Sequence, residues 1–305
     1  MSRVFYFLNM YKRLNGYKYN WIFVLAMCLG IFFVLIMLFA QVKLPVSRVN
    51  AFDSLPILVL LTFGAIIAPV LEELSFRGFF SNSNKLKIIA LIGFLSYTSL
   101  MFYSKYSIDF AVANALIFLV LITLYYKFKN NSIFVLFVIT NAVVFGLIHY
   151  NATDFIGQIN PFVLVQIILG LFLTWITINS KLWLAMIFHG AWNLIALTAM
   201  LLSLQFVSKE INVIERDNVK ISYQQVPVLD SKVITVANET NKVIGKNTTI
   251  KTLLDFALID SDLKGNYSSI VPMARYNFTI EFKDDKRNFE TVLKILQEEE
   301  MVIKN

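Results

Sequence analysis

Seven apolar runs, each close to the length of a membrane span, constrain the fold of this 305-residue chain more than any other feature. A transmembrane helix needs about 20 predominantly apolar residues. The runs lie at 21–40 and near 55–80, 88–103, 110–126, 132–150, 161–179 and 182–207. Only 15% of the residues are charged, against about 25% in soluble proteins, which excludes an ordinary soluble enzyme. We therefore predict an all-α polytopic membrane helical bundle of about seven spans, followed by a small α+β domain.

The net charge of +7 belongs to the apolar part of the chain. Residues 1–207 carry 13 Lys and Arg against 5 Asp and Glu, whereas residues 208–305 carry 14 against 15. Basic loops between spans face the cytoplasm and anionic lipid, so we expect a lipid bilayer as partner and no nucleic acid. With seven spans, nine basic residues lie on the side of the N-terminus and three on the other side. This asymmetry predicts a cytoplasmic N-terminus and an extracytoplasmic C-terminus.

The composition changes abruptly at Ser208. Beyond it, apolar and polar side chains alternate over residues 276–282, as in a half-buried strand. Residues 288–301 have the apolar stripe of a helix. We therefore divide the chain into three segments. They are an N-terminal basic segment with the first transmembrane helix at 1–54, a membrane core at 55–207, and a small soluble α+β domain, expected outside the cytoplasm, at 208–305.

Charged side chains inside an apolar run cost roughly 2.5–3.5 kcal/mol each on insertion scales, so they mark candidate functional residues. The segment PVLEELSFRGFF places Glu72, Glu73 and Arg77 in such a run. Glu73 and Arg77 are four residues apart and can neutralise each other on one helix face, whereas Glu72 points about 100° away. The pattern also fits a helix end whose carboxylates lie in headgroup water while Arg77 extends to the surface.

Both histidines of the chain lie within predicted spans. His149 follows Phe145 by one helical turn, and His189 shares a helix face with Asn193. Taken alone, His149 fits an interfacial residue, and the second pair fits a hydrogen bond between helices. Together with Glu72, these side chains supply the groups needed to activate a water molecule and to stabilise an oxyanion.

The motifs EExxxR, FxxxH and HxxxN, in this order on separate apolar segments, resemble those of the CPBP family of intramembrane proteases. That family includes the type II CAAX prenyl endopeptidases and the bacteriocin-processing and immunity proteins called Abi. The resemblance covers roughly residues 55–200 and implies hydrolysis of a peptide bond within the membrane. It also implies a protein or peptide substrate, which is prenylated in one branch of the family. Because the chain is rich in Lys, Asn and Ile, we expect a multi-pass protein of a bacterial inner membrane.

The resemblance also implies residue roles. Glu72 would act as general base on water, assisted by His149, while His189 and Asn193 would donate hydrogen bonds to the tetrahedral oxyanion. The supporting residues would be Glu73, Arg77 and Phe145. No covalent acyl-enzyme and no cofactor are expected.

Two features depart from the family pattern. Residues 208–305 lie outside the family core, and the 77-residue spacing from Glu72 to His149 holds two additional predicted spans. Idealised spans would also place these two residues at different depths in the bilayer. They can meet only if the second span continues to Phe80 or the fifth span ends inside the bilayer.

Two other functions fit the same residues. Glu72, His149 and His189 form a sound ligand set for catalytic zinc, so a zinc-dependent membrane metalloprotease is one alternative, although the HExxH spacing is absent. A non-proteolytic membrane immunity or transport protein is the other, because intramembrane carboxylates and histidines also form proton relays.

Overall fold

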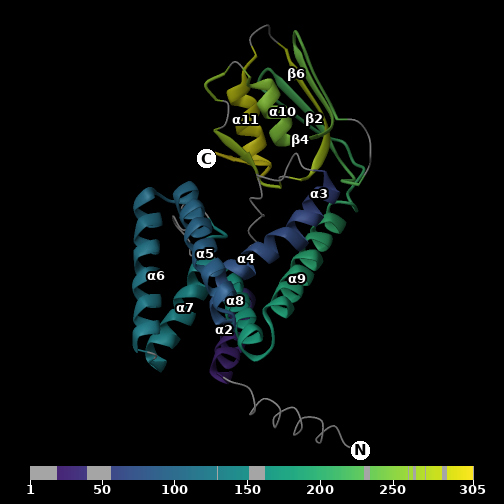
Figure 1. Ribbon diagram of the computed structural model, residues 1–305. Helices are drawn as coiled ribbons and strands as arrows, with labels where there is room; N and C mark the ends of the chain where they lie inside the picture. Colours follow the sequence, from purple (N-terminus) through teal and green to yellow (C-terminus); the bar gives the residue numbers. More distant parts are fainter. Residues whose placement is uncertain are drawn as a thin grey trace, which may run out of the picture. The chain divides into compact units, whose positions relative to one another are not determined.

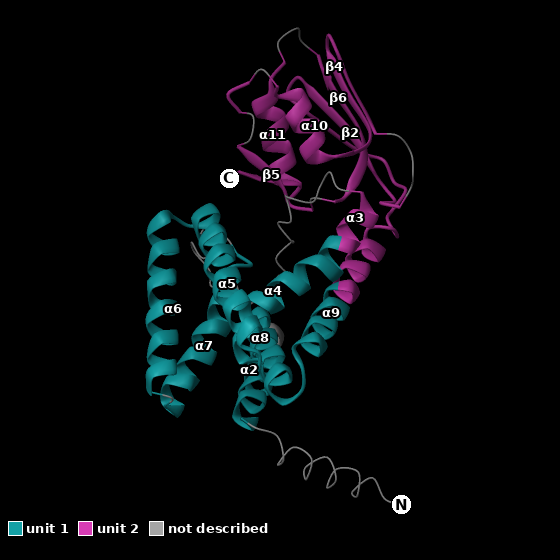
Figure 2. Ribbon diagram, in the orientation of Figure 1, with its two compact units in different colours: residues 1–43, 63–193 teal, residues 44–62, 194–305 magenta. Residues whose placement is uncertain are grey.

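The computed structural model describes residues 19–39, 56–128, 130–150, 162–229, 234–259, 261–263, 266–271, 273–283 and 287–304 (Figure 1). The basic residues predicted before the first span therefore lie outside the described residues. The chain forms two compact units (Figure 2). The first holds helix α2 and residues 63–193, and the second holds helix α3 and the described part of 194–305.

Apolar helices occupy all seven predicted runs. They are α2 (Asn20–Phe39), the continuous stretch of α3 (Ile57–Thr62), η2 (Phe63–Ile67), α4 (Ala68–Arg77) and η3 (Gly78–Phe80), then α5 (Asn84–Lys105), α6 (Ile108–Phe128), α7 (Asn131–Leu147), α8 (Phe162–Asn179) and α9 (Leu182–Ser203). Within the described residues, four segments are long and apolar enough to cross a membrane, namely 57–80, α5, α6 and α9. The helical membrane bundle is thus confirmed, whereas the count of seven spans stays a prediction.

Helix α4 lies at the centre of the first unit. It packs against α5 and α8, while α7 packs against α6 and α8, and α2 packs along α8 (Figure 1). Aromatic rings fill the space between these helices, and Phe94 stacks on Phe118 with ring centroids 3.5 Å apart. The outward sides are apolar as well, and Ile88 and Ile92 of α5 are each 61% exposed. Helices that are apolar all round are typical of membrane spans.

The second unit contains a five-stranded antiparallel sheet in the order β1-β2-β6-β4-β3. Its strands are β1 (Asn212–Arg216), β2 (Val219–Val226), β3 (Thr235–Glu239), β4 (Lys242–Thr249) and β6 (Arg275–Phe282). A two-stranded sheet pairs β5 (Tyr267–Ser269) with β7 (Val302–Lys304), and the helices are α10 (Ile250–Ala257) and α11 (Phe289–Glu298).

The core of this unit follows the side-chain pattern of β6. Alternate residues from Tyr276 to Phe282 are buried and pack with Leu253 of α10 and Val292 of α11, which confirms the predicted strand and helix. Leu60 of α3 and the end of α9 join the same core. The three segments predicted from composition stay predictions, because the units divide within the helices rather than at the change in composition.

Candidate active site

Helix α4 begins where a proline interrupts a longer helix. Pro69 has no N–H to donate to the carbonyl of Ala65, and the five residues before α4 form the π-helical turn η2. The turn lies against α9, since a Cβ on Gly190 would come 2.4 Å from the Ala65 carbonyl oxygen. Asn193 Nδ2 donates to the carbonyl oxygen of Gly64 over 3.0 Å. The HxxxN segment is therefore fixed against η2, immediately before the EExxxR helix.

The predicted pairing of Glu73 with Arg77 is present. Arg77 Nη1 lies 3.3 Å from Glu73 Oε1, and both side chains are fully buried. The guanidinium also lies over the ring of Phe145, 4.0 Å from its centroid, and Gly170 of α8 leaves room for it. Inside the bundle, the charge of Arg77 is thus balanced by one carboxylate, and its guanidinium packs against the face of one aromatic ring.

Glu73 also contacts a histidine from a different motif. His189 Nδ1 lies 2.9 Å from Glu73 Oε1, the same oxygen that pairs with Arg77. An ionised carboxylate only accepts hydrogen bonds, so Nδ1 carries the hydrogen. Nε2 of His189 is then directed to Glu72, whose Oε2 is 3.7 Å away.

His149 approaches the same oxygen of Glu72, Oε2, from a different helix. It lies in the turn just after α7, and its Nδ1 is 2.7 Å from the carbonyl oxygen of Phe145. Because a carbonyl only accepts, Nδ1 carries a hydrogen, and in the neutral ring Nε2 then presents a lone pair. His149 Nε2 lies 3.9 Å from Glu72 Oε2. Glu72 Oε2 therefore faces Nε2 of both imidazoles.

Tyr97 is a site residue that the sequence interpretation missed. Its hydroxyl donates to Glu72 Oε1 over 3.0 Å, so each carboxylate oxygen of Glu72 has different neighbours. The apolar helices carry several tyrosines, and no spacing separates Tyr97 from the others. Only the packing of α5 on α4 reveals the contact.

Lys105, the last residue of α5, and Tyr106, which follows it, hold the end of α7 just before His149. Lys105 Nζ donates to the carbonyl oxygen of Ile148, and Tyr106 Oη donates to that of Leu147 over 3.1 Å. Both carbonyls lie where the regular hydrogen bonds of α7 end, and that of Leu147 also accepts from the backbone N–H of Tyr150 over 3.1 Å. Helix α5 therefore contacts both the carboxylate and the histidine side of the site.

The structure brings Glu72 and His149 together, with His149 Nε2 3.9 Å from Glu72 Oε2. The helical stretch that carries Glu72 continues to Phe80, and α7 ends at Leu147 after 17 residues. Asn193 donates one amide hydrogen to Gly64, and no second acceptor for this amide is found among the described residues. Within the described part of the chain, no group of three or more His, Cys, Asp and Glu side chains is arranged to hold a metal ion.

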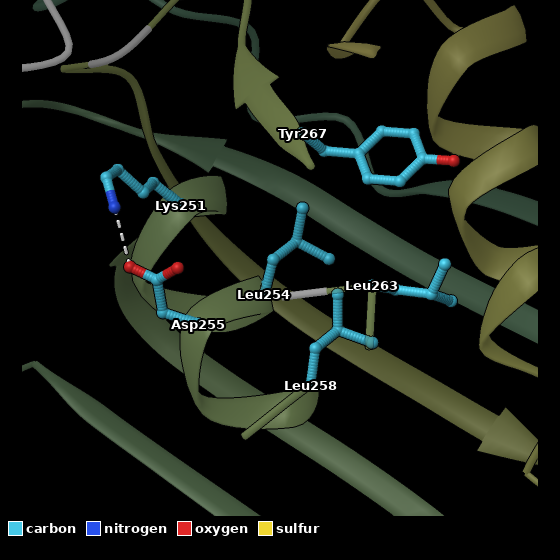
Figure 3. Close-up of a pocket in the computed structure, with 6 residues that line it drawn as sticks. All are labelled: Lys251, Leu254, Asp255, Leu258, Leu263 and Tyr267. Carbon is cyan, nitrogen blue, oxygen red and sulfur yellow. Dashed lines mark hydrogen bonds and ion pairs between the residues drawn. The ribbon is translucent and has the colours of Figure 1, made fainter. Parts of the chain in front are cut away.

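A pocket in the second unit contains none of these residues. Figure 3 shows Leu254, Leu258, Leu263 and Tyr267 lining it, with Lys251 paired to Asp255 at its edge. Lys251 Nζ lies 2.7 Å from Asp255 Oδ2, so the two charged groups are paired with each other.

A comparison with known protein families matches the part of the chain that contains the three motifs. The model of the family described as type II CAAX prenyl endopeptidase Rce1-like matches residues 54–195. No curated protein and no solved structure matches the chain.

Proposed function

We propose that the chain, whose residues 54–195 match the model of the Rce1-like type II CAAX prenyl endopeptidases, hydrolyses peptide bonds within the membrane by a water molecule that Glu72 activates. The family and the apolar helices indicate a peptidase that is an integral membrane protein. The observation that carries the proposed mechanism is the convergence of His149 Nε2 and His189 Nε2 on Glu72 Oε2.

The gap between Glu72 Oε2 and His149 Nε2 suits a shared water. A water about 2.8 Å from each atom would bridge the 3.9 Å between them. It would donate one hydrogen to the carboxylate and the other to the imidazole lone pair, which leaves its oxygen lone pairs for attack on the scissile carbonyl carbon. Glu72 would take the first proton as the new C–O bond forms.

The oxyanion formed by this attack needs hydrogen-bond donors. We assign these donors to His189 Nε2 and to the second amide hydrogen of Asn193. The assignment to His189 sets a condition on its protonation. Because Nδ1 of His189 already donates to Glu73, donation from Nε2 requires an imidazolium. Two carboxylates would then balance two cations, since Glu72 and Glu73 face Arg77 and His189. Collapse of the intermediate breaks the C–N bond, and Glu72 returns its proton to the leaving amine.

We propose a membrane peptide or protein as substrate, with a prenylated CAAX sequence as the first candidate, and no resident metal. The test uses the full chain purified in nanodiscs and a panel of membrane peptides that includes a farnesylated CAAX peptide. Wild type is expected to cleave at least one peptide with unchanged rate after chelation, whereas His149→Ala loses activity at least 100-fold.

Each alternative predicts a different result in the same samples. Stoichiometric zinc that is lost on chelation together with activity would favour a metalloprotease. A chain that cleaves nothing on the panel, and whose effect in cells survives Glu72→Gln, would point to an immunity or transport protein and would contradict the proposed hydrolysis.

A further inference from the structure

We propose that Tyr97 is a positioning residue that holds Oε1 of Glu72 and thereby makes Oε2 the oxygen that takes the proton from water. This inference rests on the proposed function, since it assigns Glu72 the role of base. The hydroxyl of Tyr97 donates to Oε1 over 3.0 Å. Tyr97 belongs to none of the three motifs, and no role assigned above includes it.

A glycine on the same face of α5 makes this contact possible. Gly93 precedes Tyr97 by one turn, and a Cβ on Gly93 would lie only 2.7 Å from Ser75 Oγ. Ser75 lies three residues after Glu72, and its hydroxyl is fixed by donation to the carbonyl oxygen of Leu71. The glycine thus allows α5 to approach α4 closely at the level of Glu72.

The ring of Tyr97 is held as well. It packs edge-on against Phe76, with ring centroids 6.3 Å apart and an interplanar angle of 89°. Phe76 is fully buried and packs in turn on Phe94. Close-packed rings of this kind restrict each other's rotation, so the hydroxyl stays directed at the carboxylate.

A carboxylate without such a contact has two equivalent oxygens. The last torsion of a glutamate side chain is broad and roughly twofold, so either oxygen can face the histidines. Hydrogen bonds to an ionised acceptor are about twice as strong as neutral ones. One such bond to Oε1 therefore distinguishes the two oxygens and leaves Oε2 opposite His149 Nε2 and His189 Nε2.

The kinetic test compares Tyr97→Phe with Tyr103→Phe in the full chain. Tyr103 lies on the same helix but is 62% exposed, so its variant controls for loss of a tyrosine hydroxyl on α5. Tyr97→Phe is expected to lower kcat roughly 10- to 100-fold with KM changed less than twofold, and Tyr103→Phe is expected to change neither. A kcat of Tyr97→Phe within twofold of wild type overturns the proposal.

Infrared spectroscopy supplies a readout that needs no substrate. The difference between wild type and Glu72→Gln isolates the carboxyl band of Glu72, and the same difference is taken in the Tyr97→Phe background. We expect the band to shift between the two backgrounds, because one oxygen loses its donor. An unshifted band overturns the proposal even if peptides are cleaved. If no peptide is cleaved, the proposed function fails while this comparison still decides whether Tyr97 holds Glu72.

Discussion

Glu73 Oε1 lies 2.9 Å from His189 Nδ1, although 116 residues separate the two side chains in the sequence. The same oxygen is 3.3 Å from Arg77 Nη1. One buried carboxylate atom thus joins a cation of its own helix to a histidine of α9. This contact links the first and third motifs and directs Nε2 of His189 to Glu72.

Removing the charge of Glu73 should destabilise the bundle. Glu73→Gln leaves the fully buried Arg77 without its counter-charge, and breaking a buried pair in this way costs about 3–5 kcal/mol. We expect a lower melting temperature in detergent, and a partial recovery when Arg77→Met is added to the same chain. The exposed Glu210 supplies the control variant Glu210→Gln. Equal melting temperatures for Glu73→Gln and wild type would show that the pair is not buried as described.

Lys105 should affect the reaction although it lies outside the motifs. Lys105→Met removes the donor to the Ile148 carbonyl, one residue before His149, so the imidazole loses part of its support. We expect kcat to fall roughly tenfold, because one hydrogen bond from a charged donor is lost. Lys85→Met, an exposed position on the same helix, should leave kcat unchanged. Equal kinetics for the two variants would contradict the proposed support of His149.

Two glycine variants should have opposite effects. Gly190→Ala places a Cβ 2.4 Å from the Ala65 carbonyl oxygen, which is backbone and cannot turn aside. We expect a loss of about 1–3 kcal/mol as α9 moves away from η2. Gly30→Ala meets nothing within 4 Å and should be neutral or stabilise helix α2 by roughly 0.5–1 kcal/mol. Thermal unfolding of both variants measures the difference, and equal stabilities would contradict the close approach at Gly190.

The sheet domain should lose stability at high pH through Tyr276. Burial raises the pKa of Tyr276 from 10.0 to about 12. The unfolded chain therefore releases this proton first, so the contribution of Tyr276 is present below pH 10 and lost as the pH rises toward 12, by at most about 2–3 kcal/mol. Tyr276→Phe cannot titrate and should show a shallower decline over this window in thermal unfolding followed against pH. A parallel decline in both proteins would mean that another group is responsible.

Helix periodicity and charge placement were sufficient to predict much of this structure. Apolar run length located the helices, and the four-residue spacing of Glu73 and Arg77 predicted an ion pair that is present. The half-buried strand ending at Phe282 also follows from alternation alone. These features depend on residues near each other in the sequence.

Contacts between helices could not be predicted in this way. The hydroxyl of Tyr97 reaches Glu72 because Gly93 lets two helices approach, and neither residue has a spacing that signals it. Likewise, the donation of Asn193 to Gly64 depends on the π-helical turn before Pro69. The spacing of HxxxN indicated a shared face but not the acceptor on that face.

Cleavage of a membrane peptide by wild type, Glu72→Gln and Asp109→Asn is the most direct measurement. Asp109 is an exposed acid at the start of α6, so its amide variant controls for the loss of one negative charge in the same bundle. A base that takes the proton from water predicts a loss of at least 100-fold in kcat for Glu72→Gln and none for Asp109→Asn. If Glu72→Gln cleaves at the wild-type rate, Glu72 is not the base and the proposed mechanism is wrong.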